Sequence, residues 1–410
     1  MLRQFLEALE SGHKTPDGLL YDCLRQIAIA EPAVHAWVAV SAQPFIPGEP
    51  LSGIPYGAKD IIETKGLATE YGSPLYEGRK GEFDAGVVAT LRRAGALLLG
   101  KTHTTAFASF DPAPTRNPRF AGHTPGGSSS GSAAAVAAGM VPFAVGTQTL
   151  GSVLRPASYC GVCGLKPTYG LIPPEGVLPF APSLDTVGFF TRTASDMACL
   201  WSRGFGGNVT GELRRAAWLH VNADGPMTEA VENAAARLRE RGVVVDELDP
   251  PRWPELTSAA YIINRYEGAR THRERFAQYG ARIGIRLADL VRSGLEVPEA
   301  EYRDAVRFVA QMRTEYTNLF WDYAAVLTPA ATGAPPEGLA YTGDPANNAP
   351  WTALGVPAIS VPLPSNGAPL GLQITAAWGR DDALVAVAVE AERHLFSSPT
   401  AWPIAATVDL

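Results

Sequence analysis

Short apolar runs that alternate with helix-forming segments constrain the fold of this chain more than any other feature. The runs are too short for buried helices, and they lie at residues 54–58, 96–100, 142–145, 325–328, 357–363 and 370–376. Helical patterns occupy residues 85–96 and 132–138, between the first three runs. Strands that alternate with helices typically build a sheet covered by helices. The sequence therefore predicts an α/β fold.

The rest of the chain is predicted to surround this core within one domain, residues 1–410. Further helices are expected at residues 1–45, 195–205, 226–241 and 382–394, and the strand VVVDEL follows Gly242. Residues 255–322 are mostly helical and rich in charge, which indicates a peripheral helical layer. We find no internal repeat and no linker at which to divide the chain.

Charge and cysteine usage exclude several classes of protein. The net charge of −7 argues against a nucleic-acid-binding protein, which would carry a basic surface. Cys160 and Cys163 form a C-x-x-C pair, but no second pair or histidine cluster accompanies them, so a zinc or redox site is disfavoured. The N-terminal segment MLRQFLEALESGHKT lacks the apolar core of a signal peptide, and no apolar stretch is long enough to span a membrane. We expect a soluble, cytoplasmic protein.

A glycine- and serine-rich loop, PGGSSSGS at residues 125–132, leads directly into the small-residue helix. It fits a turn whose serines cap that helix. A phosphate-binding loop would need Lys followed by Ser or Thr after its second glycine, where this chain has Ser132 and Ala133. The G-x-S-x-G spacing makes Ser129 a candidate elbow nucleophile, although an elbow follows a strand and here a Pro-Gly-Gly segment precedes the serine.

A catalytic serine needs a base, and the chain offers an unusual one. We expect structural roles for His103 and His123, the two histidines nearest the loop in sequence. Lys59 lies in GIPYGAKDII, among apolar residues at the end of a predicted strand, although lysines are rarely buried. Because burial disfavours the ammonium form, a buried lysine can act as a neutral base. The alternative is an exposed Lys59 that pairs with Asp60.

Several segments together resemble the amidase signature family. They are PGGSSSGSAAAVAAG followed by GTQTLGSVLRPASYCGVCGLKPTYG, the upstream GIPYGAKDIIETKGLATEYGS, and the downstream SLDTVGFFTRTASDMACL and WTALGVPAISVP. The resemblance covers nearly the whole chain and is weakest between about residues 205 and 320. It implies a large, mixed, twisted sheet covered by helices on both faces, with the signature core at about residues 50–205.

The same resemblance implies the site residue by residue. The family nucleophile falls on Ser152, its bridging serine on Ser128, its base on Lys59, and its cis peptide bond on Gly127–Ser128. The implied activity is amide hydrolysis through an acyl-enzyme, with a small-molecule amide as substrate, no metal and no cofactor. A homodimer is also implied. The oxyanion hole falls on the backbone N–H groups of Thr149, Leu150, Gly151 and Ser152.

Two positions depart from the commonest family pattern. Gln148 stands where Asp is usual and Leu150 where Gly is usual. Gln148 occurs in a recognised branch of the family. Leu150 requires an ordinary backbone conformation and narrows the pocket, which makes it the point at which the oxyanion hole would be impaired.

Arg155 indicates the substrate. Together with Gln148 and the serine-rich loop, it makes the chain similar to the bacterial malonamidase branch, in which an arginine three residues after the nucleophile binds the substrate carboxylate. A guanidinium can hold a carboxylate through two hydrogen bonds. We therefore expect Arg155 to anchor a carboxylate-bearing amide, whereas its alternative role is a structural ion pair. The other predicted substrate contacts are Thr147, Gln148 and Ser129, and Thr147 and Thr149 are expected to hydrogen-bond either the relay or the substrate. Asn264 or Arg265 is a candidate for closing the pocket.

Three other functions stay open. A broad aliphatic or aryl amidase would use Arg155 only structurally. The A subunit of a tRNA-dependent amidotransferase fits less well, because the chain is short for it and because Gln148 and Arg155 are unusual. A catalytically impaired family member that acts as a binding protein is favoured by Leu150 and disfavoured by the retention of Ser152, Ser128 and Lys59.

Overall fold

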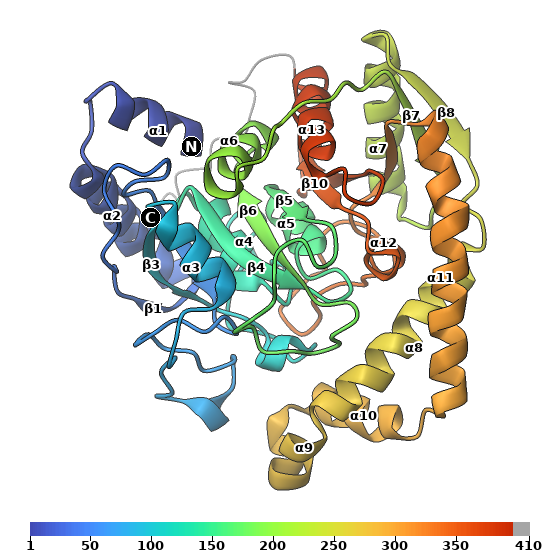
Figure 1. The fold of residues 1–410 in the computed structure, drawn as a ribbon, viewed down its shortest axis with the longest axis horizontal. Coiled ribbons are helices and arrows are strands. Elements are labelled where there is room, and N and C mark those ends of the chain that lie inside the picture. Colours follow the sequence, from blue (N-terminus) through green and yellow to red (C-terminus); the bar gives the residue numbers. More distant parts are fainter. Residues whose placement is uncertain (397–410) are drawn as a thin grey trace.

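The computed structural model describes residues 1–396, and its centre is one large mixed sheet (Figure 1). The last residues of the predicted domain, 397–410, lie outside the described residues. The strand order is β1-β3-β2-β4-β6-β5-β10-β11-β9-β7-β8. The parallel pairs are β2–β3, β2–β4, β7–β8 and β7–β9, and the other neighbours are antiparallel. The strands are β1 (Trp37–Val40), β2 (Pro55–Lys59), β3 (Leu97–Thr102), β4 (Phe143–Gln148), β5 (Cys163–Lys166), β6 (Thr186–Thr191), β7 (Arg215–Leu219), β8 (Val244–Leu248), β9 (Ala325–Pro329), β10 (Ala358–Pro362) and β11 (Gly371–Thr375).

Helices fill the connections between these strands. The α-helices are α1 (Leu2–Glu10), α2 (Pro16–Val34), α3 (Gly86–Arg93), α4 (Ser130–Ala137), α5 (Leu154–Cys160), α6 (Ala194–Phe205), α7 (Gly225–Glu240), α8 (Trp253–Thr271), α9 (Arg273–Tyr279), α10 (Ile285–Leu295), α11 (Glu299–Asp322), α12 (Ala349–Leu354) and α13 (Asp381–Leu395). Short 3₁₀ turns are η1 (Pro74–Tyr76), η2 (Ala106–Ala108) and η3 (Gly280–Ile283).

The two faces of the sheet bury two separate apolar clusters. Successive side chains of a strand point to opposite faces, and in β4 Phe143 and Val145 belong to one cluster whereas Ala144 belongs to the other. The first cluster also takes side chains from α3, α6, α7 and α13, and the second takes them from α2, α4 and α5. Helices therefore cover both faces, and the predicted α/β fold with a large mixed sheet is confirmed.

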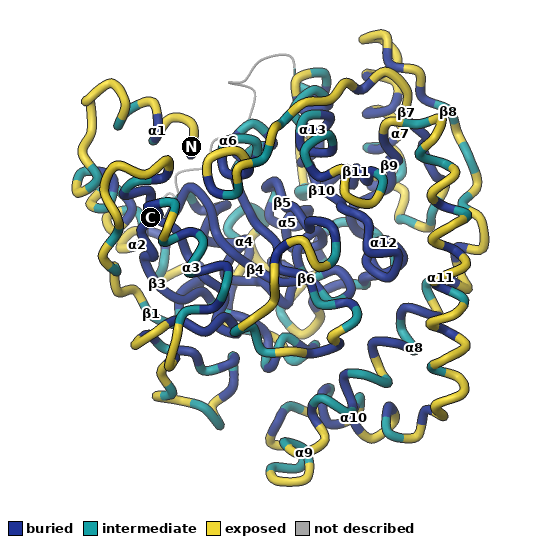
Figure 2. Tube along the Cα trace, viewed as in Figure 1, coloured by how far each residue is buried: buried dark blue, intermediate teal, exposed yellow. Residues whose placement is uncertain are grey.

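The helical layer predicted at residues 255–322 corresponds to α8–α11, which lies at the edge of the molecule in Figure 1. In Figure 2 the strands at the centre are buried, while α11 alternates between buried and exposed positions along its length. α8 packs against α10, α11 and α12. No helix within residues 1–396 is both long enough and apolar enough to cross a membrane.

The prediction of helix throughout residues 1–45 is wrong for the last part of that range. α2 ends where His35 adopts a left-handed conformation, with φ of 53°. The carboxylate of Glu31 then accepts hydrogen bonds from the backbone N–H groups of Ala36 and Trp37, at 2.9 Å each. The chain turns there into β1, which pairs with β3. The pattern of apolar residues in so short a strand does not distinguish it from a continuing helix.

Candidate active site

The glycine- and serine-rich loop passes so close to other backbone that only glycine fits at some of its positions. A Cβ on Gly126, which has φ of +79°, would lie 2.9 Å from the Cα of Pro156, and one on Gly131 would overlap the carbonyl oxygen of Ala36. The peptide bond Gly127–Ser128 is cis, as predicted. This close packing accounts for the glycines at positions 126 and 131.

Lys59 ends β2 completely buried, and its Nζ donates hydrogen bonds of 2.8 Å to Ser128 Oγ and Thr147 Oγ1. Burial lowers its pKa to about 7, against the opposing effect of the Asp185 carboxylate. The alternative of an exposed ion pair with Asp60 is therefore wrong. Asp60 instead faces the buried Lys101, whose Nζ lies 3.8 Å from the carboxylate.

Burial alone does not single out Lys59, because Lys101 and Lys166 are also fully buried. Lys101 Nζ donates to the carbonyl of Ile62 and to Thr69 Oγ1, and Lys166 Nζ donates to the carbonyl of Pro167. Of the three, Lys59 is the one bonded to a serine hydroxyl. The bond to Ser128 is therefore the property that distinguishes it.

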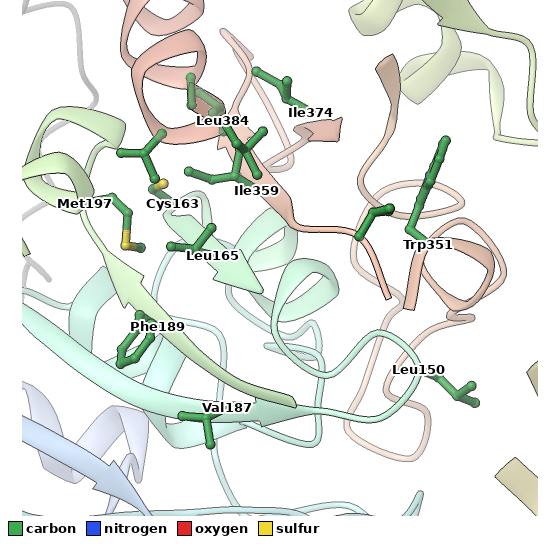
Figure 3. Close-up of a cluster of buried hydrophobic side chains, with 14 of the residues drawn as sticks. Leu150, Cys163, Leu165, Val187, Phe189, Met197, Trp351, Ile359, Ile374 and Leu384 are labelled. Atoms are coloured by element: carbon green, nitrogen blue, oxygen red, sulfur yellow. The ribbon is translucent and has the colours of Figure 1, made fainter. Parts of the chain in front are cut away.

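Ser128 and Ser152 line one pocket. The four residues predicted to form the oxyanion hole, Thr149, Leu150, Gly151 and Ser152, all line it, as does Arg155. None of these loop residues has a positive φ, so Leu150 adopts the ordinary backbone conformation that was expected. Its side chain points away from the other labelled core residues in Figure 3.

The buried side chain of Gln148 fixes the residues that follow this loop. Its Oε1 accepts hydrogen bonds from the backbone N–H groups of Val153 (2.9 Å) and Leu154 (3.0 Å), and its Nε2 donates to Thr352 Oγ1. That threonine in turn donates to the carbonyl of Leu150. The predicted contact of the Gln148 side chain with substrate is therefore corrected: the side chain is fully buried and does not line the pocket.

Ser129 also has a structural role, in place of its predicted contact with substrate. Its hydroxyl donates to the carbonyl of Thr147 (3.1 Å) and accepts from the N–H of the same residue (3.2 Å). Ser129 is buried and does not line the pocket, which excludes the elbow nucleophile as well as the substrate contact. Of the two contacts expected for Thr147, the structure has the one to the predicted relay, because the Thr147 hydroxyl accepts a hydrogen bond from Lys59. His103 and His123 do not line the pocket either.

Arg155 is buried in the wall of the pocket with one nitrogen left unpaired. Nε donates to the carbonyl of Thr342 (2.8 Å) and Nη2 to the carbonyl of Gly127 (2.7 Å), whereas Nη1 has no partner among the described residues. No ion pair with a described residue satisfies the guanidinium, so the alternative role of a structural ion pair is not realised. Burial lowers the pKa of Arg155.

Asp185 is a residue of the site that sequence reasoning missed. Its Oδ1 accepts a 2.6 Å hydrogen bond from the hydroxyl of Thr149, and its Oδ2 accepts one of 2.7 Å from the N–H of Phe180. The carboxylate thereby joins the first residue of the Thr149–Ser152 loop to another residue of the pocket wall. Its position within SLDTVG, a segment that resembles the family, was the available signal.

The C-x-x-C pair lies in the interior of the protein. Cys160 and Cys163 are both buried free thiols, and burial raises the pKa of each. Within residues 1–396, no group of histidine, cysteine and acidic side chains could hold a metal ion.

Comparison with known proteins identifies the family. The family model described as Amidase matches residues 22–206 and 213–385. The chain belongs to this family. It is an enzyme of the type that acts on amide C–N bonds, and the matched ranges contain every segment that carries the resemblance to the amidase signature.

Similar amidases include curated and solved relatives. The A subunit of the glutamyl-tRNA(Gln) amidotransferase of Thermus thermophilus is 32% identical over 93% of this chain and 94% of its own length, and that of Treponema pallidum is 33% identical over 94% and 89%. A crystal structure of an amidase superposes with a TM-score of 0.87 at 27% identity, covering 96% of this chain and 100% of the other. The Thermotoga maritima A subunit gives 0.80 at 30% identity, covering 92% and 91%.

These relatives bear on one sequence argument. The chain aligns along nearly the full length of two amidotransferase A subunits, and it is shorter than both, because the alignments run over 447 and 458 positions. The more specific resemblance to malonamidase has to be judged from the residues around the pocket.

Proposed function

We propose that this amidase hydrolyses a small amide that carries a carboxylate, with Ser152 as nucleophile, Ser128 as proton relay and Lys59 as base. The observation that carries the proposal is the 2.8 Å hydrogen bond between Lys59 and Ser128, beside a pocket that Ser152 shares. A lysine whose pKa is about 7 is neutral in a large fraction of molecules at neutral pH, so it can accept a proton.

In the proposed reaction, neutral Lys59 takes the proton of Ser128, which takes the proton of Ser152 as that oxygen bonds to the amide carbon. The oxyanion accepts hydrogen bonds from backbone N–H groups of the Thr149–Ser152 loop, each worth about 3 kcal/mol. The C–N bond then breaks as the relay returns the proton to the leaving nitrogen. Water attacks the Ser152 ester by the same relay and releases the acid.

Arg155 supports a carboxylate on the acyl side of the substrate. A buried cation is costly unless an anion or hydrogen bonds compensate it, and Nη1 lacks a partner within the described residues. Arg155 and Ser152 line the same pocket, so an anion bound at Nη1 would hold a short substrate next to the nucleophile. Malonamate has this arrangement, with its carboxylate one methylene from the amide carbon.

The test is ammonia release from malonamate, propionamide and benzamide by the wild type, Ser152→Ala and Arg155→Ala. We expect Ser152→Ala to be inactive on all three. Because Arg155 also holds the carbonyl of Gly127, Arg155→Ala lowers every rate, but the malonamate-to-propionamide ratio of kcat/KM should fall about 10- to 100-fold. Full activity of Ser152→Ala contradicts the mechanism, and an unchanged ratio favours a broad amidase.

The curated relatives favour a second candidate, the supply of amide nitrogen within a tRNA-dependent amidotransferase. L-Glutamine is therefore included in the same assay. A kcat/KM for glutamine above that for malonamate would favour this function over the first. Inactivity of the wild type on all four amides would favour the impaired binding protein.

We also propose a cytoplasmic homodimer, which rests on the family resemblance. Static light scattering of the purified protein measures its mass. A monomer at micromolar concentration would contradict the dimer.

A further inference from the structure

A second cavity, which we call the outer cleft, lies beside the Ser152 pocket. It opens to solvent and is bounded by α8, α10 and Leu150 of the Thr149–Ser152 loop. Phe110, Leu150 and Asn264 line both cavities, so the two are adjacent. The proposed chemistry, with the acyl group in the inner pocket, makes no use of this space.

The outer cleft carries one charge. Arg265 is the charged residue among those that line it, and the other polar side chains belong to Ser258, Tyr261, Asn264 and Ser293. Arg265 is exposed and forms no ion pair with any described residue. No carboxylate of the described residues lines the outer cleft, and the nearby Asp344 carboxylate is bonded to Tyr261 Oη, so the charge that faces the cleft is the guanidinium, which suits an anionic ligand.

Asn264 stands at the junction with its amide unused. The residue is 5% exposed, and its side chain makes no hydrogen bond with any described residue. Its side-chain nitrogen and oxygen are not among the fully enclosed atoms without partners, so they are accessible from the cavities. An asparagine offers both a donor and an acceptor, which suits the N–H or the carbonyl of an amide that spans the junction.

We propose that the outer cleft binds the amine part of an N-substituted amide, and that this amine part carries a carboxylate held by Arg265. The inference rests on the proposed function, because it takes the acyl part to lie at Arg155. In such a substrate the acyl carboxylate points inward and the leaving group points outward past Leu150 and Asn264. Tyr261 Oη already donates to Asp344, so its oxygen is available only as an acceptor.

The covalent steps are unchanged except for the leaving group. Ser152 Oγ bonds to the carbonyl carbon, the C–N bond breaks, and the substituted amine leaves with the proton that Ser128 returns. Water then cleaves the ester. One water is consumed, and the products are a dicarboxylate and an amino acid in place of ammonia.

The experiment compares three amides that share a malonyl acyl group: the primary amide, the N-propyl amide and the N-carboxymethyl amide. Amine or ammonia release gives kcat/KM for the wild type, Arg265→Gln and Arg273→Gln. Arg273 is a matched control, because it is an exposed arginine of the same helical layer and does not line the outer cleft. Both variants keep a long polar side chain and lose one charge.

The wild type is expected to cleave the N-carboxymethyl amide faster than the N-propyl amide. In Arg265→Gln the ratio of these two kcat/KM values should fall about fivefold, which corresponds to about 1 kcal/mol. In Arg273→Gln the ratio should not change.

Other results overturn the proposal in distinguishable ways. If the primary amide is cleaved and neither N-substituted amide is, the proposed leaving-group site is wrong and the proposed function is unaffected. Arg265 has no such role if the wild type cleaves the N-propyl amide as fast as the N-carboxymethyl amide. The same conclusion follows if the ratio of these two kcat/KM values is equal in the two variants. Activity on none of the three amides overturns the proposed function and the outer-cleft proposal with it.

Discussion

Replacement of Asp185 by Asn is predicted to move the acid limb of the pH–rate profile to lower pH. Burial lowers the pKa of Lys59 to about 7, and the negative charge of Asp185 acts against that effect. Without this charge, burial acts alone and the pKa of Lys59 falls further. Because only neutral Lys59 can accept a proton, a lower pKa extends activity to more acidic solution.

The size of the shift follows from the titration of Lys59. With a pKa of about 7, half of the molecules hold neutral Lys59 at pH 7. Each further unit of acidity then lowers kcat/KM about tenfold. Removal of a nearby buried charge moves such a limb by about one pH unit. Burial also raises the pKa of Asp185 to about 6, so its carboxylate is charged in the part of the limb that lies above that pH.

The assay is kcat/KM for malonamate between about pH 5.5 and pH 9 for the wild type, Asp185→Asn and Thr149→Val. Thr149→Val is the matched control, because it removes the 2.6 Å hydrogen bond to Asp185 and keeps the carboxylate. Both variants are expected to lower the plateau, and Asp185→Asn should move the limb further than Thr149→Val, which keeps a carboxylate that still ionises, although at a higher pH without the hydrogen bond from Thr149. A limb that stays in place in Asp185→Asn, or moves to higher pH, would refute Lys59 as the titrating base.

Three further substitutions test the site and its surroundings. Gly151→Ala would place a Cβ 2.5 Å from Oδ1 of Asn348, and the resulting displacement of the loop should lower kcat/KM about 100-fold; a change below about threefold contradicts this. Leu150→Gly removes a side chain shared by both cavities, so the benzamide-to-malonamate ratio of kcat/KM should rise about threefold or more; an unchanged ratio means that Leu150 does not limit access. Lys101→Met leaves Asp60 buried without its cation, so urea denaturation should show a loss of about 3–5 kcal/mol in the free energy of unfolding; a loss below about 1 kcal/mol would mean that this pair stabilises little.

Much of the fold was predictable because its elements have clear periods. The strands β3, β9, β10 and β11 and the helices α6, α7 and α13 lie within one or two residues of the expected ranges. The error at β1 has a local cause. The end of α2 depends on the left-handed conformation of His35 and on the Glu31 carboxylate, and neither interaction leaves a period in the sequence.

The sequence predicted the positions of site residues correctly where a residue of unusual type stands in a recognisable motif. The burial of Lys59 and its bond to Ser128 agree with the expectation. Gln148 and Ser129, which stand next to Thr149 and Ser128 in the sequence, were expected to contact the substrate. However, the direction of a side chain depends on its backbone. Gln148 ends β4 and Ser129 precedes α4, and both side chains point into the interior, where they bond to backbone groups.

In the proposed mechanism, Arg155 connects substrate binding to the geometry of the relay. One nitrogen holds the carbonyl of Gly127, the residue joined to Ser128, and a second holds the carbonyl of Thr342 in the segment that leads to α12. The third nitrogen is the unpaired Nη1 of a side chain that borders the pocket. A guanidinium is planar and rigid, so an anion bound at Nη1 is fixed relative to the peptide that carries the relay serine. This single side chain can therefore align the substrate with Ser128 without any movement of the loop.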